Sequence, residues 1–300
     1  GEVAKKMALE LGSRLACIAF AQVNNFGNLE DVHELTDLCS ELKVQSIALI
    51  DPILLATEGL IPPVEYGSKK QGANMLVGEG QHLAIAPNFG GPGLGIFGIR
   101  YNENNKLDIR STAGRFIGKA KDADGKDCLC MVLSTREQHI RREKATSNIC
   151  SNQSFIATAA GAAILARGED GMTEAALTGR DYALQMAQVL TQFKGVKLAF
   201  ESTPFYNEFT LSLPVKVSDL QKKAAAANIQ LGVDVSNRLN DGRELLFLSF
   251  FDVHNDEDLE KLENFFKEHF EAEENDEFLP EIPENFLRTS KVGLPNLEID

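Results

Sequence analysis

The sequence has little cysteine and histidine, and it lacks the motifs that usually carry metal or hydrolase chemistry. Its 300 residues include five cysteines, an odd number, and no Cys-x-x-Cys pair. This pattern favours reduced thiols over a disulfide framework or a zinc site. The five histidines are scattered, and neither Gly-x-Ser-x-Gly nor His-Glu-x-x-His occurs. A metalloenzyme or a serine hydrolase is therefore a poor interpretation.

The sequence also lacks an excess of positive charge and any apolar run of transmembrane length. It has 30 Lys and Arg against 44 Asp and Glu, which gives a net charge of −14. This balance argues against a general nucleic-acid surface and against an anionic membrane surface. Residues 251–300 hold 16 acids and 4 bases, so the rest of the sequence is nearly neutral. No basic region followed by a signal-like apolar core opens the sequence, and we expect a cytoplasmic protein.

Short apolar runs separated by helical and turn-like segments predict an α/β fold. Runs at 15–20 and 46–50 flank a helical pattern over 29–42, which is typical of two parallel strands joined by a helix. Further apolar runs follow at 74–77 and 96–99. Sites in such sheets collect at the carboxyl ends of the strands, and Asp51 directly follows the second run. An Asp-Pro pair at a strand end is equally consistent with an ordinary turn.

The second half of the sequence predicts two helices and then a compact α+β region. Gly168 and Gly171 separate helical patterns over 154–166 and 172–193, and we place a domain change there. We then expect strands at 196–200, 206–213 and 245–250, and helices at 218–227 and 257–270 with Ser218 and Asp256 as N-caps. The predicted units are a large domain over 1–168, a small α+β domain over 169–278 and an extended acidic tail over 279–300.

Two other segments have both a functional and an ordinary interpretation. Gly91-x-Gly93-x-Gly95 resembles a phosphate loop only loosely, and a tight turn before the next strand explains it better. After a predicted strand at 127–135, residues 136–144 hold four basic residues, two acids and a histidine. Such a loop between apolar elements can carry function. It can also be a solvated connector with weak ion pairs, and composition alone favours the connector.

Three motifs resemble the glycine cleavage system P-protein, the pyridoxal phosphate (PLP)-dependent glycine decarboxylase. They are REQHIRREKATSNIC at 136–150, GRFIG at 114–118, and VGEGQHL with FGGPGLGIF between 77 and 97. The resemblance is closest to the amino-terminal half of that protein, which in many prokaryotes is a separate subunit 1. It implies a fold-type-I PLP-transferase architecture, with a partial large domain around a parallel-type sheet and a smaller C-terminal α+β domain. The family has a further amino-terminal segment, so we expect uncovered apolar surface and an oligomer.

The resemblance also implies that this chain lacks the residue that anchors the cofactor. In the catalytic half of the family, the Schiff-base lysine lies shortly before a Gly-Gly-Pro-Gly turn, which is 90–93 here. Counting back reaches Gln81, and no lysine occurs from 71 to 105. A glutamine amide cannot form an aldimine. Asp51 lies where an aspartate of the family would contact the pyridine nitrogen of PLP. Both Gln81 and Asp51 are therefore expected to be vestigial.

The implied function is that of a non-catalytic subunit or half of glycine decarboxylase. The complex decarboxylates glycine and transfers the aminomethyl group to the lipoylated H-protein, with PLP bound by the catalytic subunit 2 and none in this chain. Alternatives are a self-sufficient PLP-dependent aminotransferase or decarboxylase that uses Lys69 or Lys70, and a pseudoenzyme that only assembles. Guanidinium groups bind carboxylates in a bidentate manner. We expect a partner-facing surface formed by Arg136, Gln138, Arg141, Arg142, Lys144 and Asn148.

Overall fold

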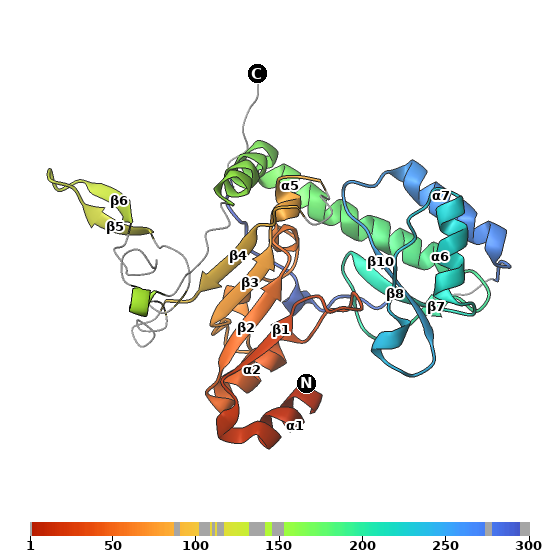
Figure 1. The fold of residues 1–300 in the computed structure, drawn as a ribbon, viewed down its shortest axis with the longest axis horizontal. Coiled ribbons are helices and arrows are strands. Elements are labelled where there is room, and N and C mark those ends of the chain that lie inside the picture. Colours follow the sequence, from red (N-terminus) through yellow and green to blue (C-terminus); the bar gives the residue numbers. More distant parts are fainter. Residues whose placement is uncertain are drawn as a thin grey trace.

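The computed structural model describes residues 2–86, 91–101, 109, 112, 117–131, 142–145, 153–273 and 278–294. Two four-stranded sheets form the two main bodies, and a separate hairpin lies apart from them (Figure 1). In one sheet the order is β1 (Cys17–Ala21), β2 (Gln45–Ile50), β3 (Met75–Glu79), β4 (Gly95–Ile99). In the other it is β7 (Lys197–Leu198), β8 (Glu208–Leu213), β10 (Glu244–Ser249), β9 (Val233–Asp234). The hairpin consists of β5 (Ile117–Lys121) and β6 (Asp127–Met131). No helix among these described residues is long and apolar enough to cross a membrane.

The first sheet contains the predicted parallel strands. β1 (Cys17–Ala21), β2 (Gln45–Ile50) and β3 (Met75–Glu79) run parallel, and β4 (Gly95–Ile99) pairs antiparallel with β3. Helix α2 (Val32–Leu42) connects β1 to β2, and the Asp31 side chain caps it by accepting from the N–H of Glu34. The helix packs on one face of the sheet, where it buries the side chains of Phe20, Ala48 and Ile50.

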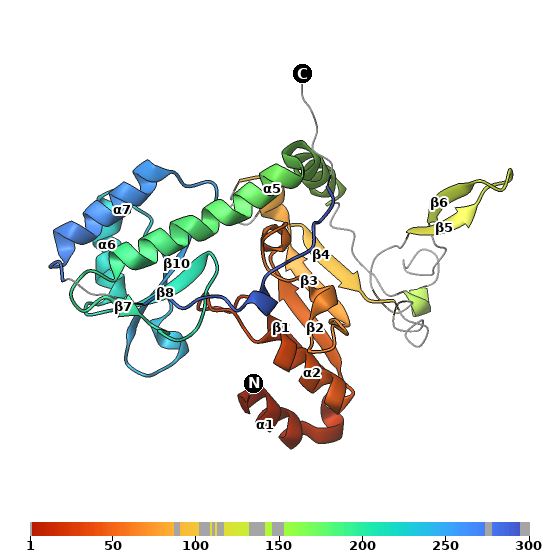
Figure 2. The ribbon, with the colours of Figure 1, turned by 180° about the vertical axis from the view of Figure 1, so that it is seen from behind.

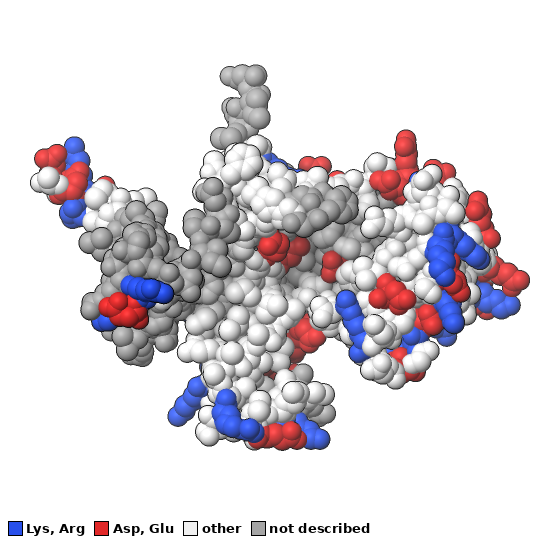
Figure 3. Space-filling model, viewed as in Figure 1, with Lys and Arg blue, Asp and Glu red and all other residues white. Residues whose placement is uncertain are grey.

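The opposite face of this sheet is exposed. Cys17 and Ala19 on β1 are exposed, and Leu49 on β2 and Phe97 on β4 are 41% and 46% exposed. Figure 3 shows a broad area over these strands that is largely free of charged side chains. Helix α1 (Glu2–Leu11) also exposes apolar side chains, among them Met7. The uncovered apolar surface expected from the sequence is therefore present.

The second sheet is antiparallel and covered by helices. It contains β7 (Lys197–Leu198), β8 (Glu208–Leu213), β9 (Val233–Asp234) and β10 (Glu244–Ser249), with helices α6 (Val217–Ala226) and α7 (Asp256–His269). The core joins Phe209, Leu211 and Leu246 of the sheet to Leu220 of α6 and Phe266 of α7. The sequence analysis did not predict strand β9, because a strand of two residues is too short to show an alternation of apolar and polar side chains.

Both N-caps predicted for these helices are wrong. Helix α6 follows Lys216, which makes no side-chain capping bond, so Ser218 lies inside the helix. Helix α7 is capped by Asn255, whose side chain accepts from the N–H of Asp258 while the Asp258 carboxylate accepts from the N–H of Asn255. Several neighbouring polar residues can each serve as an N-cap, and composition does not decide among them.

Two helical segments that meet at a kink make up α5 (Ser154–Leu190), in agreement with the two helices predicted from the sequence. Gly168 interrupts it with φ 64° and ψ −168°, a conformation that glycine adopts without steric cost, while Gly171 lies within the helix. The second half of α5 packs against the second sheet through Met186 and Leu190. The kink at Gly168 coincides with the predicted boundary at 168, and the domain limits remain a prediction.

The loop between β1 and α2 joins the two sheets. The Phe26 carbonyl accepts from Thr210 Oγ1 at 2.8 Å, and the Leu29 N–H donates to the Pro204 carbonyl at 2.8 Å. Gly27 is buried at φ 82°, and a Cβ there would lie 2.5 Å from the carbonyl carbon of Glu208. Only glycine fits this approach, so the loop holds the start of β8 close to the first sheet.

The described part of the predicted tail returns to the first sheet (Figure 2). Apart from a short turn of 3₁₀ helix, Glu284–Phe286, it is extended. The Ile61 N–H donates to the Phe286 carbonyl at 2.9 Å, and the Glu169 carboxylate accepts from the N–H groups of Val292 and Leu294. This segment therefore connects the second sheet back to the surroundings of β2.

Candidate functional site

The first group of polar side chains lies at the carboxyl ends of β2 and β3. Asp51 follows β2, and its Oδ1 accepts from the N–H of Ile53 at 3.0 Å. His82 lies in the 3₁₀ turn Gln81–Leu83 after β3, and its Nε2 is 3.0 Å from the same carboxylate oxygen. This hydrogen bond raises the pKa of His82 above its usual value, and the negative charges of Asp51 and Glu79 act in the same direction. Asp51 therefore lies at the predicted strand end, where it pairs with His82.

The Gln81 side-chain amide donates its hydrogen bonds within its own turn. Its Nε2 donates to the carbonyls of Ile85 and Ala86, each at 2.8 Å, and its backbone N–H donates to Glu79 Oε1 at 2.8 Å. Glu79 also accepts from the N–H of Leu94 at 2.6 Å, and this bond is the main cause of its lowered pKa. A carboxylate that binds the glycine-rich segment disfavours a phosphate there. The described part of the segment, 91–94, leads directly into β4, and residues 87–90 lie outside the described residues.

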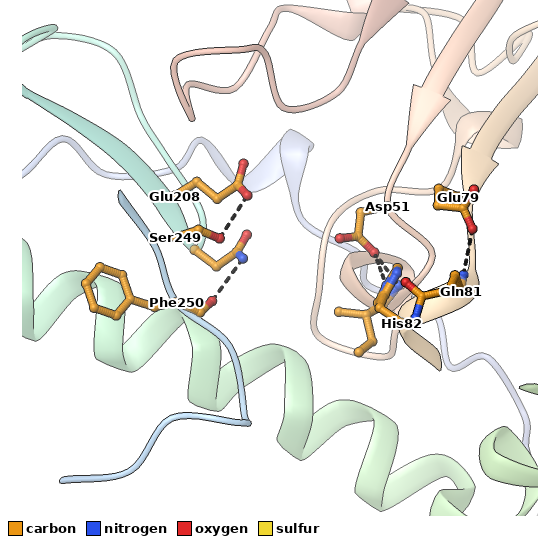
Figure 4. Close-up of polar contacts among 9 residues, drawn as sticks. Asp51, Glu79, Gln81, His82, Glu208, Ser249 and Phe250 are labelled. Atoms are coloured by element: carbon orange, nitrogen blue, oxygen red, sulfur yellow. Dashed lines mark hydrogen bonds and ion pairs between the residues drawn. The ribbon is translucent and has the colours of Figure 1, made fainter. Parts of the chain in front are cut away.

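The second sheet presents a carboxyl group to this edge. Glu208 opens β8 opposite Ser249 of β10, whose Oγ donates to Glu208 Oε1 at 3.0 Å. Burial raises the pKa of Glu208 to about 7, and the charge of Asp51 adds to this effect. Figure 4 shows Glu208 and Ser249 on one side of the space between the sheets and Asp51, His82 and Gln81 on the other.

An ion pair between Arg167 and Asp252 lies at the same boundary. Arg167 Nη1 is 2.7 Å from Asp252 Oδ2, and this ion pair joins the first half of α5 to the loop after β10. The charge of Asp252 also helps to raise the pKa of His82. Sequence reasoning missed Glu208, Asp252 and His82. His82 adjoins Gln81 and could have been noticed, whereas Glu208 and Asp252 carry no local signal.

This arrangement does not fit a covalently bound PLP. An aldimine requires a lysine amine, and Gln81 supplies an amide that already donates to two carbonyls. The Asp51 carboxylate, which would meet a pyridine nitrogen, instead holds His82 and the N–H of Ile53. The two alternative amines, Lys69 and Lys70, precede β3 and lie beyond its amino end. A five-residue strand, about 16 Å long, separates that end from the edge near Asp51.

The predicted partner-facing residues are only partly described. Arg142 and Lys144 lie in a short 3₁₀ turn, Arg142–Lys144, and both are exposed. The other four, Arg136, Gln138, Arg141 and Asn148, lie outside the described residues.

Solved structures place the fold in a known class of enzyme. A NifS-like protein from Rickettsia africae superposes with a TM-score of 0.59 at 15% identity, covering 89% of this chain and 65% of that one. A structure described as having glycine covalently linked to PLP superposes with a TM-score of 0.58 at 14% identity. The fold is that of the fold-type-I PLP enzymes, as predicted from the sequence.

The family is defined by closer matches. The glycine cleavage system P-protein model matches residues 2–266, and the chain belongs to this family. Its relatives include a probable glycine dehydrogenase (decarboxylating) subunit 1 of Beijerinckia indica, 36% identical over 251 residues that make up 83% of this chain and 53% of the relative. The corresponding protein of Moorella thermoacetica is 35% identical over 261 residues, 87% of this chain and 55% of the relative. The chain thus spans about half the length of the curated relatives it matches.

A solved member of the family agrees with this assignment. The crystal structure of a glycine decarboxylase (P-protein) of the glycine cleavage system, in inhibitor-bound form, superposes with a TM-score of 0.74 at 28% identity. The superposition covers 86% of this chain and 56% of that one.

Proposed function

We propose that this chain belongs to the non-catalytic subunit, or half, of a glycine decarboxylase whose PLP is held by a catalytic partner. The complex would decarboxylate glycine and transfer the aminomethyl group to lipoylated H-protein. The relatives named subunit 1 support a two-subunit enzyme. The observation that carries the non-catalytic assignment is Gln81, which follows β3 where the family resemblance puts the lysine and whose amide donates to the Ile85 and Ala86 carbonyls.

In this proposal the polar side chains at the edge of the first sheet and opposite it stabilise the structure and take no part in catalysis. His82 holds Asp51, and the loop around Gly27 keeps Glu208 and Ser249 near them. The Gly27 loop crosses between the two bodies, whereas the Asp51–His82 and Glu208–Ser249 pairs each lie within one of them. The self-sufficient enzyme is disfavoured because Lys69 and Lys70, its candidate Schiff-base residues, precede β3, whereas Asp51 and Gln81 follow the carboxyl ends of β2 and β3.

Borohydride reduction tests this assignment directly. The chain and the catalytic subunit are mixed with PLP, reduced, digested and mapped for pyridoxyl-lysine. We expect stoichiometric label on the catalytic subunit and no specific label on this chain. A single stoichiometric pyridoxyl-lysine in this chain, at Lys69, Lys70 or elsewhere, would refute the proposal. Exchange of the glycine carboxyl group with bicarbonate, measured with H-protein, should require both subunits, whereas activity of this chain alone would favour the self-sufficient enzyme.

We also propose that Arg142 and Lys144 face the catalytic subunit. Their exposure and the bidentate geometry of guanidinium support this placement. Arg142→Lys keeps the charge but loses the fork, so it should weaken subunit association in sedimentation experiments. Lys222→Ala on α6 is the matched control and should have no effect. Unchanged association of Arg142→Lys would return this turn to the solvated-connector interpretation.

A further inference from the structure

Helix α5 changes direction at Gly168, in a backbone conformation that is specific to glycine (Figure 1). Its φ of 64° and ψ of −168° lie in a region where any side chain would be strained. The first half of the helix, 154–167, and the second half, 169–190, are therefore joined by one residue without helical geometry. Hinges in proteins are one or a few residues at the ends of rigid elements. Gly168 is placed as such a hinge.

The two halves of α5 pack against different parts of the molecule. Met186 of the second half belongs to the core of the second body. Ile164 of the first half and Leu83, in the 3₁₀ turn after β3, pack against the same apolar cluster and line the same cavity. A movement at the kink would therefore shift the first half of α5 and the turn 81–83 relative to the second body.

The end of the described C-terminal segment, residues 288–294, binds directly beside the kink, and we call it the strap. The Glu169 carboxylate accepts from the N–H of Val292 at 3.1 Å and from the N–H of Leu294 at 2.6 Å. It also accepts from the hydroxyl of Thr57, in the loop after β2, and this bond is the main cause of the lowered pKa of Glu169. One carboxylate thus ties α5, the loop after β2 and the strap together.

The strap is anchored at its start and held mainly by hydrogen bonds beyond it. Phe286 and Leu287, just before the strap, pack against the apolar cluster. In the strap itself, the Arg288 N–H donates to the Gly59 carbonyl at 2.9 Å. A cavity of about 240 Å³ separates the strap from α5 and the loop after β2. Protein interiors are normally close-packed, so the strap forgoes part of its apolar contact and can be released without unfolding the rest of the segment.

We propose that the strap is a latch on the Gly168 hinge: bound to Glu169 it fixes the kink, and its release lets the first half of α5 move with the turn 81–83. The other polar restraint at the kink is the ion pair of Arg167 with Asp252, whose side chains are 39% and 24% exposed. A pair so open to solvent contributes little. The latch does not depend on the proposed function, because all of its contacts lie within this chain.

Hydrogen–deuterium exchange of the full chain, followed by peptide mass spectrometry, tests the latch. Glu169→Ala removes the acceptor that the strap and Thr57 share. We expect the amides of 156–167 and 83–85 to exchange about tenfold faster, together with those of the strap, while the amides of 180–190 keep their parent rate. Glu174→Ala, at an exposed position of the same helix, is the matched control and should exchange like the parent.

A second variant approaches the latch from the strap. Val292→Pro removes the N–H that donates to Glu169 and Thr57 but leaves α5 unaltered, so it should give the same pattern. Val292→Ala keeps this N–H and should exchange like the parent. Faster exchange confined to the strap in either the Glu169→Ala or the Val292→Pro variant would overturn the latch, because the strap would then dock without restraining the hinge. Equal acceleration in 180–190 would also overturn it, since the change would be a general loss of stability.

Discussion

Glu208 allows a quantitative test of the space between the two sheets. Burial raises the pKa of its carboxyl from 4.5 to about 7, with a smaller contribution from the charge of Asp51 and a compensating hydrogen bond from Ser249. Between pH 4.5 and pH 7 the unfolded chain has already lost this proton while the folded chain keeps it. The stability associated with Glu208 is therefore present at low pH and is lost as the pH rises through this window. The full loss in the free energy of unfolding is about 3 kcal/mol.

Glu208→Gln should remove this penalty and keep an acceptor for Ser249. We expect the variant to be more stable than the parent by about 3 kcal/mol at pH 8, but by only about 1 kcal/mol at pH 5, where the folded carboxyl is protonated. Urea unfolding at the two pH values measures both differences. Glu260→Gln, at an exposed position on α7, is the control and should show no such pH dependence.

Equal stabilisation of Glu208→Gln at pH 5 and pH 8 would refute this reasoning, because the gain would then come from packing rather than from the charge. A loss of stability at pH 8 would show that the Glu208 anion is favoured by its surroundings. Either result would require a different account of why a carboxyl group lies opposite Asp51.

Three further predictions concern local structure. Asn255→Ala removes the acceptor that caps α7 and should lower the free energy of unfolding by about 1 kcal/mol in urea; an unchanged value would mean that the cap contributes nothing. Glu169→Gln weakens the acceptor for the N–H of Leu294, so limited proteolysis should cleave the returning C-terminal segment faster, and equal cleavage would count against this contact. Cys39 is buried and its pKa is raised to about 11, so it should alkylate far more slowly than exposed Cys17 until urea removes the difference. Similar native rates would contradict the burial of α2.

Local patterns in the sequence were sufficient for the elements of the first sheet. The apolar runs at 15–20 and 46–50 and the helix between them follow from short-range preferences, and the structure has β1, α2 and β2 there. The position of Asp51 at a strand end was predictable for the same reason. The family motifs identified Gln81 and the P-protein family, because a motif lies in consecutive residues and needs no tertiary contact.

The composition of the site was decided by tertiary structure. Glu208 opens a strand of the second sheet and approaches Asp51 only because the buried Gly27 loop brings the two bodies together. The Asp51 and His82 pair likewise depends on the parallel pairing of β2 with β3, and the shifted pKa of Glu208 depends on burial that no local pattern reveals. Sequence patterns report interactions between neighbours along the chain, whereas burial and charge at this site arise from segments that meet only after folding.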